Sequence, residues 1–169
     1  MSRQVFDEAI GFTLQWENWK SNDSYGGETI WGVAYRYHPK EVEKMRDMNR
    51  HDAMKYSKQF YYEKYWRPAS CDDFGKCTAI AMFDSAVNPG LHAAIKCLQR
   101  AINVIDDGVI GPKTIKAVEG LSDIHVALLM IGQRKKYYQS KVMETPAKSI
   151  FLNGWINRCE SLGKFVRTL

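Results

Sequence analysis

Apolar residues recur at steps of three and four along most of the chain, which is the spacing of amphipathic helices and not of strands. The pattern predicts helices over residues 5–14, 40–48, 50–65, 72–87, 91–102, 123–142 and 148–165, with a further helix that starts at Pro112. Asn49 and Ser122 are expected as N-caps, Asp72 and Asp73 as the acidic start of one helix, and Gly154 as a bend in the last. The sequence therefore predicts a mainly helical protein.

Residues 22–34 interrupt the helical pattern. The stretch from Ser21 to Gly27 is rich in turn formers, and Gly26-Gly27 can take the positive φ of a tight hairpin turn. One short β-hairpin is therefore expected near residues 22–34, folding the chain back toward the end of the first helix.

Glu17 stands at the end of the apolar stripe of the first helix, three residues beyond Leu14 and four beyond Thr13. A carboxyl in such a place is poorly solvated when charged, so its pKa is expected to rise, as a general acid requires. The hairpin would bring Asp23 and Thr29 near it. Paired carboxylates with a hydroxyl are the groups that glycoside hydrolysis uses. The alternative is a helix-capping turn with an ordinary surface glutamate.

The charge balance favours an acidic polymer as partner, because the net charge is +5 and the pI is near 9.0. Nucleic acid and anionic cell wall both qualify. The chain has no basic helix with interleaved aromatic residues and no zinc-finger spacing, so nucleic acid is not the expected partner. The basic run Arg134-Lys135-Lys136 is expected to be a solvated helix face.

Neither a metal nor a cofactor is expected. The four cysteines lack zinc-site spacing and are expected to be free thiols, and the loop with Asp106, Asp107 and Gly108 lacks the ligand pattern of a calcium site. The N-terminus does not read as a secretory signal, and no stretch approaches the roughly twenty apolar residues of a membrane span. Membrane insertion is therefore not expected.

Several blocks in fixed order carry a resemblance to a known family. They are Glu17, Tyr25–Val33, Tyr65-Trp66, Phe83–Gly90, Leu98–Ala101, Asp107–Thr114 and Gly154–Arg158. Together they resemble glycoside hydrolase family 108, the phage-type N-acetylmuramidases, over about residues 5–165. The fold expected from pattern and resemblance is mainly α, a lysozyme-like α+β fold.

The resemblance implies that Glu17 is the catalytic acid. Two departures concern its partners: the family usually has two glycines after the glutamate, where this chain has Asn18-Trp19, and an aspartate two residues before Gly-Gly, where it has Ser24 and places Asp23 one residue earlier. The expected catalytic residues are therefore Glu17, with Asp23 as electrostatic partner and Thr29 to orient water.

Four residues are expected to bind substrate, namely Tyr25, Gly27, Tyr65 and Asn88. Tyr65 lies in a dense aromatic segment that either stacks on sugar rings or packs in the core. Asn88 either faces an N-acetyl or hydroxyl group or ends a helix. Asp84, on a buried helix face, needs a partner and is expected to be a structural hydrogen-bond acceptor.

The expected organisation is a single domain over residues 1–169, with a catalytic part over about 1–90 and a helical part over about 91–169 packed onto it. The DGVIGPKT block of the second part also resembles peptidoglycan-binding helical modules. The expected activity is hydrolysis of the β-1,4 bond between N-acetylmuramic acid and N-acetylglucosamine. A lytic transglycosylase and a non-catalytic wall-binding module are the alternatives.

The expected setting follows from the absence of a recognisable export signal. A monomer would be made in the host cytoplasm and act on peptidoglycan in the periplasm. A holin or a secretion system would release it.

Overall fold

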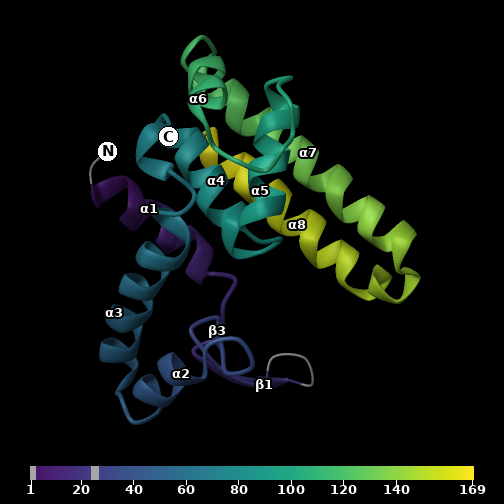
Figure 1. The fold of residues 1–169 in the computed structure, drawn as a ribbon. Helices are drawn as coiled ribbons and strands as arrows, with labels where there is room; N and C mark the ends of the chain where they lie inside the picture. Colours follow the sequence, from purple (N-terminus) through teal and green to yellow (C-terminus); the bar gives the residue numbers. More distant parts are fainter. Residues whose placement is uncertain (1–2, 24–26) are drawn as a thin grey trace. The chain divides into compact units, whose positions relative to one another are not determined.

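The computed structural model describes residues 3–23 and 27–169 and divides the chain into two compact units (Figure 1). The smaller unit is Ile10–Lys64, and the larger unit combines Met1–Ala9 with Tyr65–Leu169. The chain passes between them twice, inside α1 (Arg3–Leu14) and inside the π-helical turn η1 (Tyr62–Trp66). The smaller unit is thus inserted in the sequence of the larger one, and each unit is described by itself.

The smaller unit contains an antiparallel sheet in the order β1-β2-β3 and two helices. The elements are β1 (Lys20–Asp23), β2 (Gly27–Ile30), β3 (Val33–Ala34), α2 (Pro39–Arg46) and α3 (Arg50–Tyr61). Lys20 pairs with Ile30 and Thr29 pairs with Ala34. The predicted hairpin is therefore present, and a third short strand extends it.

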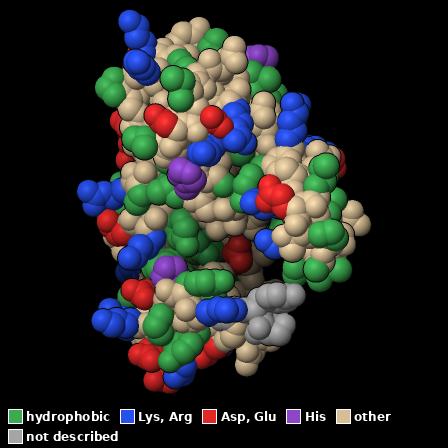
Figure 2. Space-filling view, turned by 45° about the vertical axis from the view of Figure 1, so that its right-hand side comes forward, with side chains coloured by type: hydrophobic (Ala, Val, Ile, Leu, Met, Phe, Trp, Pro, Cys, Tyr) green, Lys and Arg blue, Asp and Glu red, His purple; other side chains and the backbone are tan. Residues whose placement is uncertain are grey.

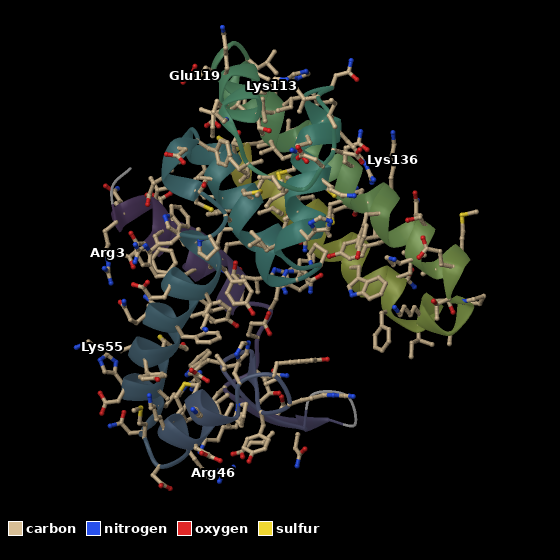
Figure 3. The ribbon with its side chains drawn as sticks, viewed as in Figure 1. Arg3, Arg46, Lys55, Lys113, Glu119 and Lys136 are labelled. Atoms are coloured by element: carbon tan, nitrogen blue, oxygen red, sulfur yellow. The ribbon has the colours of Figure 1, made fainter. Side chains whose placement is uncertain are left out.

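Apolar burial and polar contacts both stabilise this unit. Its core includes Ile30, Val33, Val42, Met45 and Ala53, all at most 1% exposed. Asn49 caps α3 as predicted, since its Oδ1 accepts from the backbone N–H groups of His51 and Asp52, both at 3.0 Å. Arg46, labelled on α2 in Figure 3, pairs with Glu28 of β2 at 2.7 Å.

The larger unit is helical and is organised around α4. Its elements are η2 (Cys71–Asp73), α4 (Lys76–Val87), α5 (Leu91–Ala101), α6 (Pro112–Glu119), α7 (Asp123–Glu144), η3 (Pro146–Lys148) and α8 (Ser149–Val166). Every residue of α4 from Cys77 to Ala86 is buried, because α5, α7 and α8 all contact this helix. α7 and α8 run side by side (Figure 1). α8 is one continuous helix through Gly154, so the chain does not leave the helix at that residue.

The start of α4 differs from the prediction. Asp123, at the start of α7, accepts from the backbone N–H groups of Cys77 at 2.7 Å and Thr78 at 2.9 Å. Asp72 instead accepts from Trp66 Nε1 at 3.1 Å, within the turn that precedes α4. Ser122 makes no side-chain cap to α7. The acidic pair predicted to start α4 is therefore replaced in this role by a carboxylate from a distant element.

Candidate functional site

Glu17 lies in a tightened turn that continues the path of α1. The backbone N–H groups of Gln15, Trp16 and Glu17 each bond to the carbonyl three residues earlier, at 3.2, 3.1 and 3.3 Å. These bonds satisfy carbonyls that the end of an α-helix leaves open. They place the half-buried Glu17 directly beyond the buried Thr13 and Leu14.

The carboxyl of Glu17 lies against the turn between β2 and β3. Trp31 and Gly32 form this two-residue turn with φ values of 47° and 77°, and two positive φ values are the requirement of a type I′ hairpin. A Cβ placed on Gly32 would be 2.8 Å from Glu17 Oε2 and would overlap the hydroxyl of Tyr61. The missing side chain of Gly32 therefore makes room for the carboxyl and for the phenol together.

Trp31 holds a left-handed backbone conformation that costs an ordinary residue about 1 kcal/mol or more. Its N–H donates to the carbonyl of Trp19 at 3.1 Å, and its carbonyl accepts from Tyr61 Oη at 3.0 Å. The Arg50 guanidinium lies 5.4 Å from the centre of the Trp31 ring. Contacts from three separate segments thus fix this strained turn beside Glu17, as is common at functional sites.

Of the other site residues predicted in the smaller unit, the structure describes Gly27 and Thr29 fully and Asp23 by its backbone alone. Thr29 Oγ1 donates to the carbonyl of Gly27 at 3.4 Å, and Gly27 has a φ of 70°. Asp23 pairs through its backbone with Gly27, but its side chain lies outside the described part of the chain, as does all of Tyr25. Glu17, Gly27 and Thr29 therefore share one unit.

Tyr65 and Asn88 belong to the larger unit. Tyr65 is half-buried in η1. Asn88 is exposed at the C-terminal end of α4, where its N–H donates to the carbonyl of Asp84 at 3.2 Å. The helix-ending role foreseen for Asn88 is therefore confirmed, and its side chain also accepts a hydrogen bond from the hydroxyl of Tyr138.

A buried ionic cluster occupies the core of the larger unit. The carboxylate of Asp84, which is 0% exposed, pairs with Arg134 and Arg158, each at 2.7 Å. Burial alone would raise the pKa of the Asp84 carboxyl, but the two arginine charges and their hydrogen bonds hold it well below its usual value. The prediction that Asp84 has a structural partner is confirmed.

Arg134 contradicts the expectation for the basic run that it begins. It is completely buried, whereas Lys136 points away from α7 into solvent (Figure 3). The reason is the carboxylate of Asp84, whose place in the core cannot be deduced from the local charge pattern.

Sequence reasoning did not identify Gly32, Tyr61 and Tyr138 as residues around the candidate positions. Gly32 had one local signal, because a glycine between two short strand-like segments is typical of a hairpin turn. Tyr61 and Tyr138 are reached only through tertiary contacts. Within residues 3–22 and 27–169, no group of three or more His, Cys, Asp or Glu side chains is arranged to hold a metal ion, and no helix is long and apolar enough to span a membrane.

Comparison with known proteins assigns both parts of the chain. Residues 10–90 match the glycosyl hydrolase 108 family, and residues 93–160 match the family described as a predicted peptidoglycan domain. The solved structure of Brucella abortus SagA is similar with a TM-score of 0.79 and 22% sequence identity, over 99% of this chain and 96% of that chain. At this identity the similarity establishes the fold. No curated protein sequence matches the chain.

These matches confirm the predicted mainly helical, lysozyme-like α+β fold. The region that holds Glu17 and the Trp31–Gly32 turn falls within residues 10–90. The region that holds α5, α6 and α7 falls within residues 93–160, except for the first residues of α5. Residues 10–90 therefore belong to the glycosyl hydrolase 108 family, and the function of the protein is directed at peptidoglycan.

Proposed function

We propose that the protein is an N-acetylmuramidase that hydrolyses the β-1,4 bond between N-acetylmuramic acid and N-acetylglucosamine. The observation that carries this proposal is the half-buried carboxyl of Glu17, which lies against Gly32 in the region that matches the glycosyl hydrolase 108 family. A carboxyl held partly out of water beside a fixed backbone turn suits a general acid.

In the proposed reaction Glu17 donates its proton to the glycosidic oxygen as the bond to the sugar breaks. Water supplies the hydroxyl that ends on the new reducing sugar, and its proton restores Glu17 or an acceptor nearby. Asp23 is proposed to stabilise the positive charge that develops on the sugar, and Thr29 to orient the water. Tyr25 and Gly27 from the smaller unit, with Tyr65 and Asn88 from the larger unit, are proposed to bind the glycan.

A lytic transglycosylase is the second candidate, because it needs one carboxyl only. The support for it is that Glu28, the acidic residue next to Thr29 in β2, is engaged by Arg46 at 2.7 Å. In that reaction the muramyl hydroxyl attacks internally and leaves an anhydro end. A non-catalytic wall-binding module is the third reading, in which Glu17 has a structural role.

The experiment is a digest of purified peptidoglycan, reduced with borohydride and analysed by mass spectrometry. Reduced muramic acid at the new ends is the expected result. Anhydromuramic ends would establish the transglycosylase, and reduced glucosamine would show that the other bond is cut. Glu17→Gln should abolish the new ends without loss of wall binding. Glu28→Gln, which is the same chemical change at another glutamate, is the control and should still release them. Binding with no new ends from the unchanged protein would favour the binding module.

We further propose that the protein acts as a monomer on the wall in the periplasm after release by a holin or a secretion system. Expression in the cytoplasm alone should then leave cells intact, while co-expression of a holin should lyse them. Lysis that needs no helper would reject this route.

A further inference from the structure

A chain of hydrogen bonds leads from the buried ionic cluster of the larger unit to the exposed side chain of Asn88. Arg134 Nη1 donates to Asp84 Oδ2 at 2.7 Å and to Ser85 Oγ at 3.4 Å, while its Nε donates to Tyr138 Oη at 3.0 Å. The hydroxyl of Tyr138 in turn donates to Asn88 Oδ1. Arg134, Asp84 and Tyr138 are all at most 2% exposed.

The direction of each bond in this chain is fixed by chemistry. A guanidinium can only donate, so the oxygen of Tyr138 must accept from Arg134. The proton of Tyr138 remains available to another acceptor, and the carbonyl oxygen of the Asn88 side chain accepts it. Burial, opposed by the charge of Arg134, raises the pKa of Tyr138 to about 12, so this proton is present at every working pH.

The cluster has an excess of donors, which favours the arrangement in which Asn88 Oδ1 is the acceptor. Two guanidinium groups face one carboxylate, and Arg134 Nη2 is buried with no acceptor in the part of the chain that the structure describes. An inverted Asn88 would point its amide donors at a hydroxyl that already receives Arg134 Nε. The side chain of Asn88 is therefore held with Oδ1 inward.

The consequence is that Asn88 presents its two amide donors outward while Tyr138 engages Oδ1. Its amide Nδ2 carries two N–H groups, which make no hydrogen bond to the described residues, and the side chain is exposed. The half-buried ring of Trp155 stacks on the ring of Tyr138, with centroids 4.8 Å apart and planes at 20°. An apolar ring therefore lies against Tyr138, the residue that orients Asn88.

We propose that Asn88 is a specificity-determining residue whose oriented amide donates to the carbonyl oxygen of an N-acetyl group on the glycan. This inference rests on the proposed function, because it takes peptidoglycan as the ligand. Both sugars of that polymer carry an acetamido group, whose carbonyl can only accept. A fixed donor distinguishes such a group from the free amine, which is a donor at neutral pH, and from a sugar that lacks the group.

The test measures binding in a Glu17→Gln parent, so that no glycan is cut. The ligands are insoluble peptidoglycan and the same material after chemical de-N-acetylation. Asn88→Ala should weaken binding to the acetylated glycan by about tenfold, because the loss of one hydrogen bond to an acceptor is worth roughly that factor. On de-N-acetylated glycan the variant and the parent should bind alike. Asn153→Ala, an exposed asparagine of α8, is the matched control.

Tyr138→Phe is the second variant, because it frees the orientation of Asn88 without removing its amide. It should reduce the preference for the acetylated glycan, and a thermal melt measures any loss of stability separately. A role of Tyr138 in stability alone would lower the melting temperature and leave the preference unchanged, which would overturn its part in the inference.

Two results would overturn the assignment of Asn88: unchanged binding of Asn88→Ala to the acetylated glycan, or an equal loss on both glycans. These outcomes are independent of the bond that is cut. If the protein releases muramic ends but Asn88→Ala does not selectively weaken binding to the acetylated glycan, only this inference is contradicted. If Asn88→Ala selectively weakens binding to the acetylated glycan but the unchanged protein releases no ends, only the proposed muramidase activity is contradicted.

Discussion

Two glycines of the smaller unit allow the effect of backbone strain to be distinguished from the effect of a steric clash. Gly27 and Gly32 have similar positive φ values, 70° and 77°. A Cβ on Gly27 would have no atom within 4 Å, whereas one on Gly32 would collide with Tyr61 and Glu17. Alanine at either position is strained, but only alanine at Gly32 displaces the candidate acid.

Gly32→Ala should therefore reduce glycan hydrolysis by at least about tenfold more than Gly27→Ala does, and the unfavourable φ of Gly27→Ala should cost about 1 kcal/mol of stability. Initial rates on purified peptidoglycan and urea unfolding curves of both variants measure the two effects. Equal rates for the two alanines would show that the Gly32 contact does not matter for Glu17.

Asp84 pairs with both Arg134 and Arg158 in the buried cluster, so its charge state affects folding. Its pKa is depressed in the folded protein, which means that the unfolded chain binds its proton more readily. The stabilisation by the charged form is complete above the unfolded pKa of about 3.9 and is lost as the pH falls toward the lower folded value.

The free energy of unfolding should therefore decline from about pH 4 downward. Asp84→Asn should cost about 3–5 kcal/mol at neutral pH, because it removes the buried carboxylate that pairs with both arginines, and it should make the loss of stability at acid pH less steep. Asp73→Asn, an exposed carboxylate, serves as the control. Urea unfolding from acid to neutral pH measures both, and a steep acid limb that persists in Asp84→Asn would assign the effect to other carboxylates.

At the scale of elements, α4 depends on a cap from α7. Asp123 covers two N–H groups of its first turn, and Gly75 leaves room for it, since a Cβ there would be 2.5 Å from Asp123 Oδ1. A carboxylate at this end also interacts favourably with the helix dipole.

Asp123→Ala should reduce the free energy of unfolding by about 1–2 kcal/mol. Ser122→Ala should change it little, because Ser122 makes no side-chain cap. Chemical denaturation of both variants is the measurement. A larger loss in Ser122→Ala than in Asp123→Ala would restore the assignment that the sequence alone suggests.

This cap shows which parts of the fold are readable from sequence. The cap of α3 by Asn49 was predicted, because donor and acceptor are three residues apart at most. The cap of α4 joins residues 46 apart, and the turn at Trp31 has a bulky residue where glycine or asparagine is usual. Likewise Glu17 was found by its place on the first helix, whereas Tyr61, which shares the space beside Gly32, was not. Local patterns predict local contacts, and the remainder depends on tertiary packing.

At the scale of the whole molecule, the surface carries mixed charge with a net excess of +5. Figure 2 shows Lys and Arg interspersed with Asp and Glu over the face in view. Lys113 and Lys136 extend into solvent (Figure 3). Such charges attract an anionic wall from a distance but form few fixed contacts.

The rate on whole cell walls should therefore fall steeply as salt rises through about 0.1 M, where the screening length is roughly 10 Å, while the rate on a short neutral glycan should not. Lys113→Glu with Lys136→Glu should lower the rate on walls at low salt and leave the neutral glycan unaffected. Turbidity clearing and release of soluble ends provide the two rates. The same salt dependence on both substrates would argue against electrostatic attraction.

The insertion of the smaller unit into the sequence of the larger one limits where two related proteins can be joined to make a chimaera. The family boundary falls between residues 90 and 93, but α4 lies before it and the partners of Asp84 lie after it. A chimaera joined there would inherit a buried carboxylate from one parent and its arginines from the other. The exchangeable segment is instead Ile10–Lys64, with two junctions, one within α1 and one within η1. The segment to exchange as one piece is therefore the smaller unit, and the region over residues 93–160 stays with the rest of the larger unit.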